Sequence, residues 1–204
     1  DKNYDFRTRL INQSTSDPKR IIVEHQQGIK SFYFDEKVDQ FVEESSTSKL
    51  VSGSGELFES NEGVFWTNDG QEDGVMVKLV PVFIDGKLDL EASEYIKYGT
   101  EKGLPDAGIG FNTIDDEIYI FSGEIEKTYG YNPETDRFEE RKFFFDEYLD
   151  WDRPGTSPLK TSDGKVFFSA GKGILVAEKV NGKYQITNTD TFKEIKNNRI
   201  FTIY

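Results

Sequence analysis

Short apolar runs separated by turn-forming dipeptides recur along this chain of 204 residues. The stretch DGKVFFSAGKGILV, residues 163–176, contains one apolar run, a gap of small residues that ends at Gly173, and a second apolar run. Short runs that are rich in β-branched and aromatic residues and bounded by turn signals are typical of antiparallel strands. No window keeps a sustained helical period, so the pattern predicts an all-β protein with little helix.

Related segments elsewhere in the chain indicate an internal repeat. The other copies are residues 17–44, 53–70 and 113–140, and the glycines that break the four copies are Gly28, Gly63, Gly123 and Gly173. Their spacing is irregular but close to the size of a four-stranded blade. We therefore expect a β-propeller-like array of about four four-stranded antiparallel blades, incomplete or part of a larger propeller. The expected blades of this single domain, residues 1–204, are 1–44, 45–100, 101–155 and 156–196, with 197–204 as the start of a further blade.

Dipeptides that reach positive φ easily mark the expected tight hairpins between these strands. They are Asp69-Gly70, Asp85-Gly86, Asp163-Gly164 and Asn181-Gly182. In the longer turn YNPETDRF, Asp136 could accept an Asx hydrogen bond. On the strand FWTND, simple alternation predicts that one of the rings of Phe65 and Trp66 points inward and the other outward.

The composition excludes several classes of function. The formal net charge is −13, so nucleic acid and anionic membrane surfaces are unfavourable partners. The chain has no cysteine, which excludes disulfides, thiolate catalysis and cysteine-ligated zinc. The longest apolar stretch, residues 75–84, is interrupted by Lys78 and Pro81 and is much shorter than a bilayer span. We expect no membrane contact by this segment itself.

Residues 103–140 resemble the two-component regulator propeller repeat. The matching residues are Gly103-Leu104-Pro105, Ile118 to Phe121, Tyr131-Asn132 and Phe138. The chain departs from that repeat where Tyr119 or Phe167 replaces its usual tryptophan. The resemblance implies the extracytoplasmic sensor region of a membrane-bound histidine kinase, hybrid regulator or diguanylate cyclase, and we expect it to be present here as a fragment. It also implies a periplasmic or extracellular location, a homodimer in the intact receptor, and an enzymatic output domain outside this segment.

The densest polar and aromatic cluster is DEYLDWDRPGTSP, residues 146–158. Its candidate ligand-binding residues are Tyr148, Asp150, Trp151, Asp152 and Arg153. An exposed aromatic ring beside carboxylates can hold a sugar by stacking and hydrogen bonds, so we expect a small polar or carbohydrate-like ligand. A connecting loop with solvated charges would have the same composition.

Two other functions remain open for the chain. A propeller-type glycan hydrolase or lyase could use Asp150 and Asp152 as general acid and base, with Arg153 beside them. A purely structural scaffold could instead bind another protein through an apolar blade face. We favour the ligand-sensing module and expect no catalytic residue in this segment.

Few residues could support metal or nucleophilic chemistry. His25 is the only histidine, and we interpret it as a partly exposed loop residue. The segment DGKLDLE, residues 85–91, lacks the spacing of a calcium loop, and Asp115-Asp116 is better interpreted as a turn. No metal and no cofactor is expected.

Overall fold

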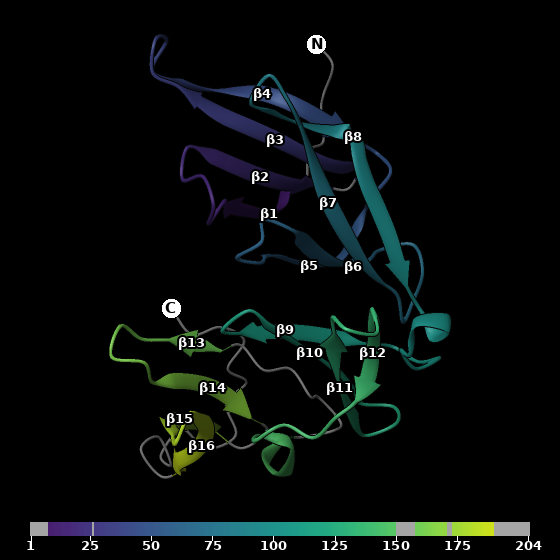
Figure 1. Ribbon diagram of the computed structural model, residues 1–204, viewed down its shortest axis with the longest axis vertical. Coiled ribbons are helices and arrows are strands. Elements are labelled where there is room, and N and C mark those ends of the chain that lie inside the picture. Colours follow the sequence, from purple (N-terminus) through teal and green to yellow (C-terminus); the bar gives the residue numbers. More distant parts are fainter. Residues whose placement is uncertain (1–7, 26, 150–157, 171–172, 190–204) are drawn as a thin grey trace. The chain divides into compact units, whose positions relative to one another are not determined.

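The computed structural model describes residues 8–25, 27–149, 158–170 and 173–189. Sixteen strands and two short 3₁₀ helices, η1 (Thr100–Lys102) and η2 (Asp146–Tyr148), form this described part. The strands make four four-stranded antiparallel sheets, and in each sheet hydrogen-bonded neighbours follow one another along the chain (Figure 1). These four antiparallel blades confirm the predicted all-β fold of the β-propeller type.

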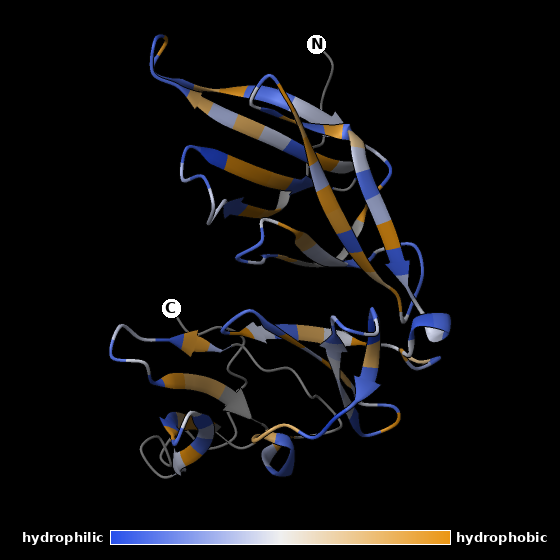
Figure 2. Ribbon diagram, viewed as in Figure 1, coloured by the Kyte–Doolittle hydropathy of each residue, from blue (hydrophilic) through white to orange (hydrophobic). Residues whose placement is uncertain are grey.

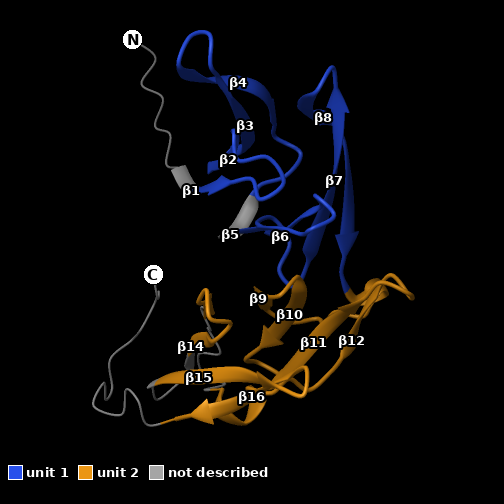
Figure 3. Ribbon diagram, turned by 60° about the vertical axis from the view of Figure 1, so that its left-hand side comes forward, with its two compact units in different colours: residues 1–99 blue, residues 100–204 orange. Residues whose placement is uncertain are grey.

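The chain divides into two compact units, residues 1–99 and residues 100–204, with two sheets in each (Figure 3). The sheets of the first unit are β1 (Thr8–Gln13), β2 (Arg20–His25), β3 (Gly28–Asp35) and β4 (Gln40–Thr47), then β5 (Ser52–Glu59), β6 (Phe65–Asp69), β7 (Met76–Ile84) and β8 (Lys87–Tyr98). The sheets of the second unit are β9 (Gly110–Ile114), β10 (Glu117–Ser122), β11 (Lys127–Asn132) and β12 (Arg137–Glu140), then β13 (Leu159–Lys160), β14 (Val166–Ala170), β15 (Gly173–Val180) and β16 (Lys183–Asn188).

Each unit has its own hydrophobic core, to which both of its sheets contribute. Figure 2 shows hydrophobic residues along strands such as β2, β7 and β14 and hydrophilic residues at most connecting turns. In the first unit, Ile22 and Ile29 pack in one cluster with Phe65, Leu79 and Leu88 of the second sheet. Burial of these side chains is the main favourable contribution to folding, because each leaves water completely or nearly so.

A buried ion pair lies within the first sheet of the first unit, and its carboxylate also bonds to the second sheet. The Arg20 side chain lies 2.8 Å from Glu44, and both are almost fully buried. Glu44 also accepts hydrogen bonds from the Ser31 hydroxyl and from the Leu88 N–H of β8. The bond to Leu88 holds β4 beside β8. Losing it would be costly, because a buried carboxylate is unfavourable unless hydrogen-bond donors compensate its charge.

Two of the four expected tight hairpins are confirmed. Ile84 pairs with Lys87 across Asp85-Gly86, and Val180 pairs with Lys183 across Asn181-Gly182. All four turn residues have positive φ. Two-residue turns with positive φ have a backbone twist that matches the twist of the flanking strands.

The other two dipeptides lie in longer connections, so the prediction of tight hairpins there is wrong. Asp69 is still part of β6, and β7 begins only at Met76. Near Asp163-Gly164 the flanking pair is Lys160 with Val166, and a hydrogen bond from the Thr161 N–H to the Lys165 carbonyl closes the loop.

Two local predictions about side chains are corrected. Phe65 and Trp66 are both buried, because β6 is covered on both faces: Phe65 lies in the core cluster, and Trp66 packs against Tyr98 with ring centroids 5.2 Å apart. In the turn after β11, the Asx hydrogen bond is accepted by Asn132 from the Glu134 N–H. Asp136 instead contacts the Tyr131 hydroxyl and Lys102.

Candidate ligand-binding site

An aromatic run, RKFFFDEYL (residues 141–149), follows β12 and leads into η2. Phe145 is 1% exposed, and its ring packs 4.9 Å from that of Tyr119 and 5.6 Å from that of Phe168. Phe144 contacts Phe168 and Tyr184 with ring centroids 5.8 Å and 5.4 Å apart. Because Tyr119 belongs to one sheet of the second unit and Phe168 and Tyr184 to the other, the run is anchored on both.

A pocket of about 530 Å³ lies beside this aromatic run, entirely within the second unit. Its wall combines the start of β11, the chain from the end of β12 to η2, and the middle of β16. The lining residues that matter most for its chemistry are Thr128, Arg141, Phe144, Asp146, Tyr148 and Tyr184. Convergent polar groups beside aromatic rings in a concave surface are typical of a small-molecule site.

Thr128 and Asp146 form the buried polar part of the pocket. The Thr128 Oγ1 lies 2.7 Å from Asp146 Oδ2, and Asp146 Oδ1 is buried without a hydrogen-bond partner among the described residues. Burial raises the pKa of Asp146; the Thr128 hydroxyl, the nearby Phe143 N–H and the charge of Lys142 lower the pKa but do not outweigh burial. The pocket therefore contains a carboxyl group with spare hydrogen-bonding capacity.

The charges at the rim of the pocket are largely paired. Lys127 lies 2.5 Å from Glu140, and Arg141 forms an ion pair with Glu117. The remaining ionisable rim residues are Glu126, Lys142 and Glu147. This balance provides no strong net charge for an ionic ligand, and it favours an uncharged polar one.

Tyr184 is held in place by a carboxylate on the neighbouring sheet. Its hydroxyl donates a 2.9 Å hydrogen bond to Asp115, in the turn between β9 and β10. Asp115 also forms ion pairs with Lys160 and Lys179. Although partial burial of Asp115 acts in the opposite direction, these bonds lower its pKa to about 2. The wall formed by β16 is thus fixed by a charged cluster that joins the two sheets of the unit.

The structure places one of the residues expected from sequence in this pocket. Tyr148 ends η2, lines the pocket and is 38% exposed. The other four expected residues, Asp150, Trp151, Asp152 and Arg153, lie outside the described residues. Asp146 lay in the quoted sequence cluster but was not singled out there, and Thr128 and Tyr184 were missed because they are remote in sequence.

The remaining sequence candidates do not form a site in the described part of the chain. His25 is the last residue of β2 and is only 8% exposed, so the loop interpretation is wrong. Its Nδ1 accepts a hydrogen bond from the Gln27 N–H, and burial lowers its pKa. Asp115-Asp116 is the expected turn, since Ile114 pairs with Glu117. Within the described residues no cluster of acidic and histidine side chains could hold a metal ion.

Comparison with known proteins gives one result for sequences and another for structures. No protein-family model and no curated protein matches the sequence. The resemblance of residues 103–140 to the propeller repeat therefore stays a prediction at the level of the family.

Solved structures resemble the chain over nearly its whole length. The extracellular domain of BT4673 from B. thetaiotaomicron, described as a one-component system, is 14% identical; the match has a TM-score of 0.53 and covers 96% of this chain and 24% of that one. A catalytically inactive virginiamycin B lyase from Staphylococcus aureus is 12% identical, with a TM-score of 0.52 and coverage of 93% and 58%. A streptogramin B lyase is 15% identical, with a TM-score of 0.50 and coverage of 90% and 55%.

At these identities the likeness shows the fold alone. The chain spans little more than half the length of the two lyases and about a quarter of the BT4673 domain. Among the described residues, no helix has the length and apolar character needed to span a bilayer.

Proposed function

We propose that this chain is part of an extracellular sensing module of a signal-transduction receptor, and that the pocket in its second unit binds a small hydroxyl-bearing ring such as a sugar. The observation that carries the proposal is the exposed Tyr148 ring on the same short turn as Asp146, with both side chains lining one pocket. A ring ligand could stack on Tyr148 while its hydroxyl groups bond to Asp146.

The assignment to a sensor is supported by the likeness in fold to the extracellular domain of BT4673. Because that likeness is limited to the fold, the pocket supplies the argument for a ligand. The extracellular or periplasmic location and the attachment to an anchored receptor belong to the same proposal. A population shift between two pocket conformations is the simplest physical route from ligand binding to an output domain.

A binding screen with a matched pair of variants tests the proposal. The protein is incubated with a panel of neutral monosaccharides and oligosaccharides, and binding is detected as a rise in melting temperature and confirmed by calorimetry. Tyr148→Ala should weaken binding about tenfold or more, because it removes the stacking surface. Phe41→Ala is the control, since Phe41 is 48% exposed on β4 and does not line the pocket.

The outcomes separate the sensor from the alternatives. Binding that is weakened in Tyr148→Ala and unchanged in Phe41→Ala supports the proposal. Release of new reducing ends or unsaturated products from the ligand would show a hydrolase or lyase instead. If no sugar binds, or if both variants bind as well as the wild type, the pocket is not the site that we propose.

A further inference from the structure

The contacts of one hydroxyl group determine where a proton lies in the pocket. Thr128 Oγ1 is 2.7 Å from the Arg141 carbonyl oxygen and 2.7 Å from Asp146 Oδ2. A threonine hydroxyl has a single proton, and a carbonyl oxygen can only accept. If Thr128 donates to Arg141, the short contact with Asp146 needs a proton that comes from Asp146.

The surroundings of Asp146 favour the protonated form. Thr128 is only 3% exposed, and Asp146 Oδ1 is shielded from solvent without a partner among the described residues. Burial disfavours the carboxylate more than the Thr128 hydroxyl, the Phe143 N–H and the charge of Lys142 together stabilise it, which raises the pKa of Asp146. The other titratable or charged groups that line the pocket are Glu126, Lys127, Glu140, Arg141, Glu147, Tyr148 and Tyr184.

Most of these groups are engaged elsewhere. Lys127 and Arg141 are paired with Glu140 and Glu117, and the Tyr184 hydroxyl is bonded to Asp115. Glu126 and Glu147 also line the pocket. Lys142 is thus the cation whose charge acts on the carboxyl, and it is exposed to screening solvent.

We propose that Asp146 determines the specificity of this pocket as a neutral carboxylic acid: it donates its proton to Thr128 Oγ1, so that the pocket presents no carboxylate charge to a ligand. This inference rests on the proposed function and defines its ligand as uncharged. A cationic ligand would gain no counter-ion from a neutral acid, and an anionic ligand would find no donor there.

Loss of this proton changes the wall of the pocket. An ionised Asp146 attracts the Thr128 proton, and the Arg141 carbonyl then loses its hydrogen bond. That bond, together with the 3.0 Å bond from the Arg141 N–H to the Thr128 carbonyl, ties the start of the aromatic run to β11. Binding therefore weakens as the pH rises through the pKa of Asp146. In the limit where only the acid form binds, the affinity falls about tenfold per pH unit above that pKa.

The first experiment measures the dissociation constant of the tightest-binding sugar between about pH 4 and about pH 8. The wild type should lose affinity with rising pH. Asp146→Asn should bind at all pH values with the affinity that the wild type shows at low pH, because an amide keeps both an acceptor and a donor. Glu134→Gln, in the turn after β11 and outside the pocket lining, should keep the pH dependence of the wild type. A flat wild-type profile, an unchanged slope in Asp146→Asn, or loss of binding in folded Asp146→Asn overturns the inference.

A second measurement does not depend on any ligand. The infrared difference spectrum of wild type minus Asp146→Asn, recorded over the same pH range, should retain the C=O stretch of a protonated carboxyl at pH values above the range in which ordinary aspartates ionise. A protonated carboxyl band without sugar binding leaves the proton assignment standing and contradicts the proposed function. Sugar binding with only carboxylate bands supports the proposed function and contradicts the proton assignment.

Discussion

Asp115 joins the two sheets of the second unit through its charge. It accepts from Lys179 at 2.6 Å and from the Tyr184 hydroxyl at 2.9 Å, and it also pairs with Lys160. Three elements of the neighbouring sheet, β13, β15 and β16, thus meet at one carboxylate. Clusters of this kind contribute more than isolated surface pairs, because one charge serves several partners that are already in place.

Replacement of Asp115 by asparagine should lower the free energy of unfolding at neutral pH by about 1 kcal/mol, after allowance for partial solvent exposure. The pKa in the folded protein is about 2, below the ordinary aspartate value of 3.8, so the stabilisation is present above about pH 4 and is lost as the pH falls toward 2. Urea unfolding at several pH values should therefore show wild type and Asp115→Asn converging in acid. Asparagine keeps the turn, where φ is 52°, because it tolerates the left-handed region.

The same substitution at Asp116 is the matched control. Asp116 occupies the next position of the same turn, with φ of 64°. Asp116→Asn should change stability by less than Asp115→Asn, because it leaves the ion pairs of Asp115 with Lys160 and Lys179 in place. Equal effects of the two variants would mean that the turn, and not the cluster around Asp115, accounts for the loss.

At the level of elements, the glycines that break the repeat have different roles. Gly28 opens β3 with φ of 141°, and a Cβ placed there would lie 1.9 Å from the carbonyl oxygen of Thr47 in β4. Gly63 has φ of 75°, but a Cβ there would meet nothing within 4 Å. Of these two glycines, only Gly28 has the backbone of the neighbouring strand in the space of a side chain.

Gly28→Ala should therefore be much more destabilising than Gly63→Ala. We expect a loss of about 3 kcal/mol or more for Gly28→Ala, because the neighbouring strand must move, and about 1 kcal/mol for Gly63→Ala from the left-handed backbone alone. Urea unfolding monitored by tryptophan fluorescence measures both, since Trp66 is buried in this unit. Similar losses in the two variants would contradict the close approach of β3 and β4.

The fold could be predicted from the sequence because the features that determine it act between residues close together in the chain. Strand periodicity and dipeptides such as Asp85-Gly86 and Asn181-Gly182 act over a few residues, and each hairpin joins consecutive strands. Alternation failed at Trp66 because both faces of β6 are covered, and which faces are covered depends on packing between elements.

The candidate site was accessible only in part for the same reason. Tyr148 lies in a conspicuous run of aromatic and acidic residues, and such a run can be recognised from the sequence alone. Thr128 and Tyr184 belong to β11 and β16, and they meet Asp146 only through the packing of the aromatic run on both sheets. Nothing in the residues around Thr128 distinguishes it from an ordinary strand threonine.

At the scale of the whole molecule, the dominant electrostatic feature is the excess of acidic residues. The chain has 38 aspartates and glutamates against 25 lysines and arginines. Many cations are already engaged in ion pairs on their own sheets, such as Lys97, which contacts both Asp69 and Glu72 at 2.8 Å. The surplus carboxylates therefore repel one another in the compact state more than in the unfolded chain.

Salt should consequently stabilise this protein. Screening weakens the repulsion among the surplus carboxylates, and it also weakens exposed ion pairs; the first effect should dominate because exposed pairs contribute about 0–1 kcal/mol each. Raising sodium chloride from about 0.02 M to about 0.5 M, which shortens the screening distance severalfold, should raise the melting temperature. Calorimetry at neutral pH measures the shift.

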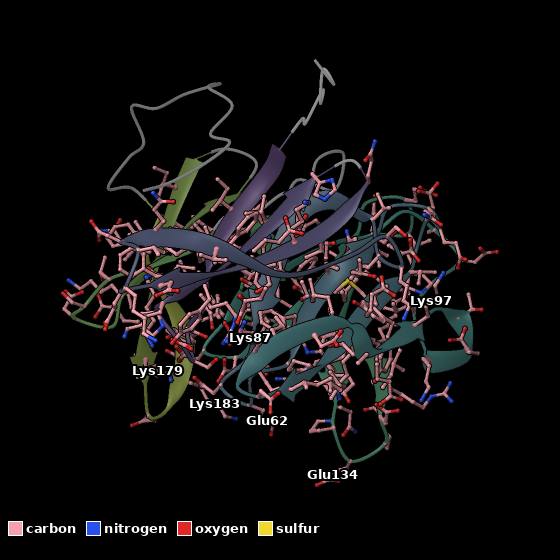
Figure 4. The ribbon with its side chains drawn as sticks, turned by 90° about the horizontal axis from the view of Figure 1, so that it is seen from above. Glu62, Lys87, Lys97, Glu134, Lys179 and Lys183 are labelled. Carbon is pink, nitrogen blue, oxygen red and sulfur yellow. The ribbon has the colours of Figure 1, made fainter. Side chains whose placement is uncertain are left out.

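Two variants of opposite charge make this test specific. Glu62, Glu134 and Lys183 are all exposed, lie in different sheets or their turns, and project from the ribbon (Figure 4). The double variant Glu62→Gln with Glu134→Gln changes the net charge from −13 to −11; it should melt at a higher temperature in low salt and respond less to added salt. Lys183→Gln changes the net charge from −13 to −14 and should do the opposite. A melting temperature that falls with salt in the wild type would mean that local ion pairs, such as those of Lys97 and Asp115, outweigh the net charge.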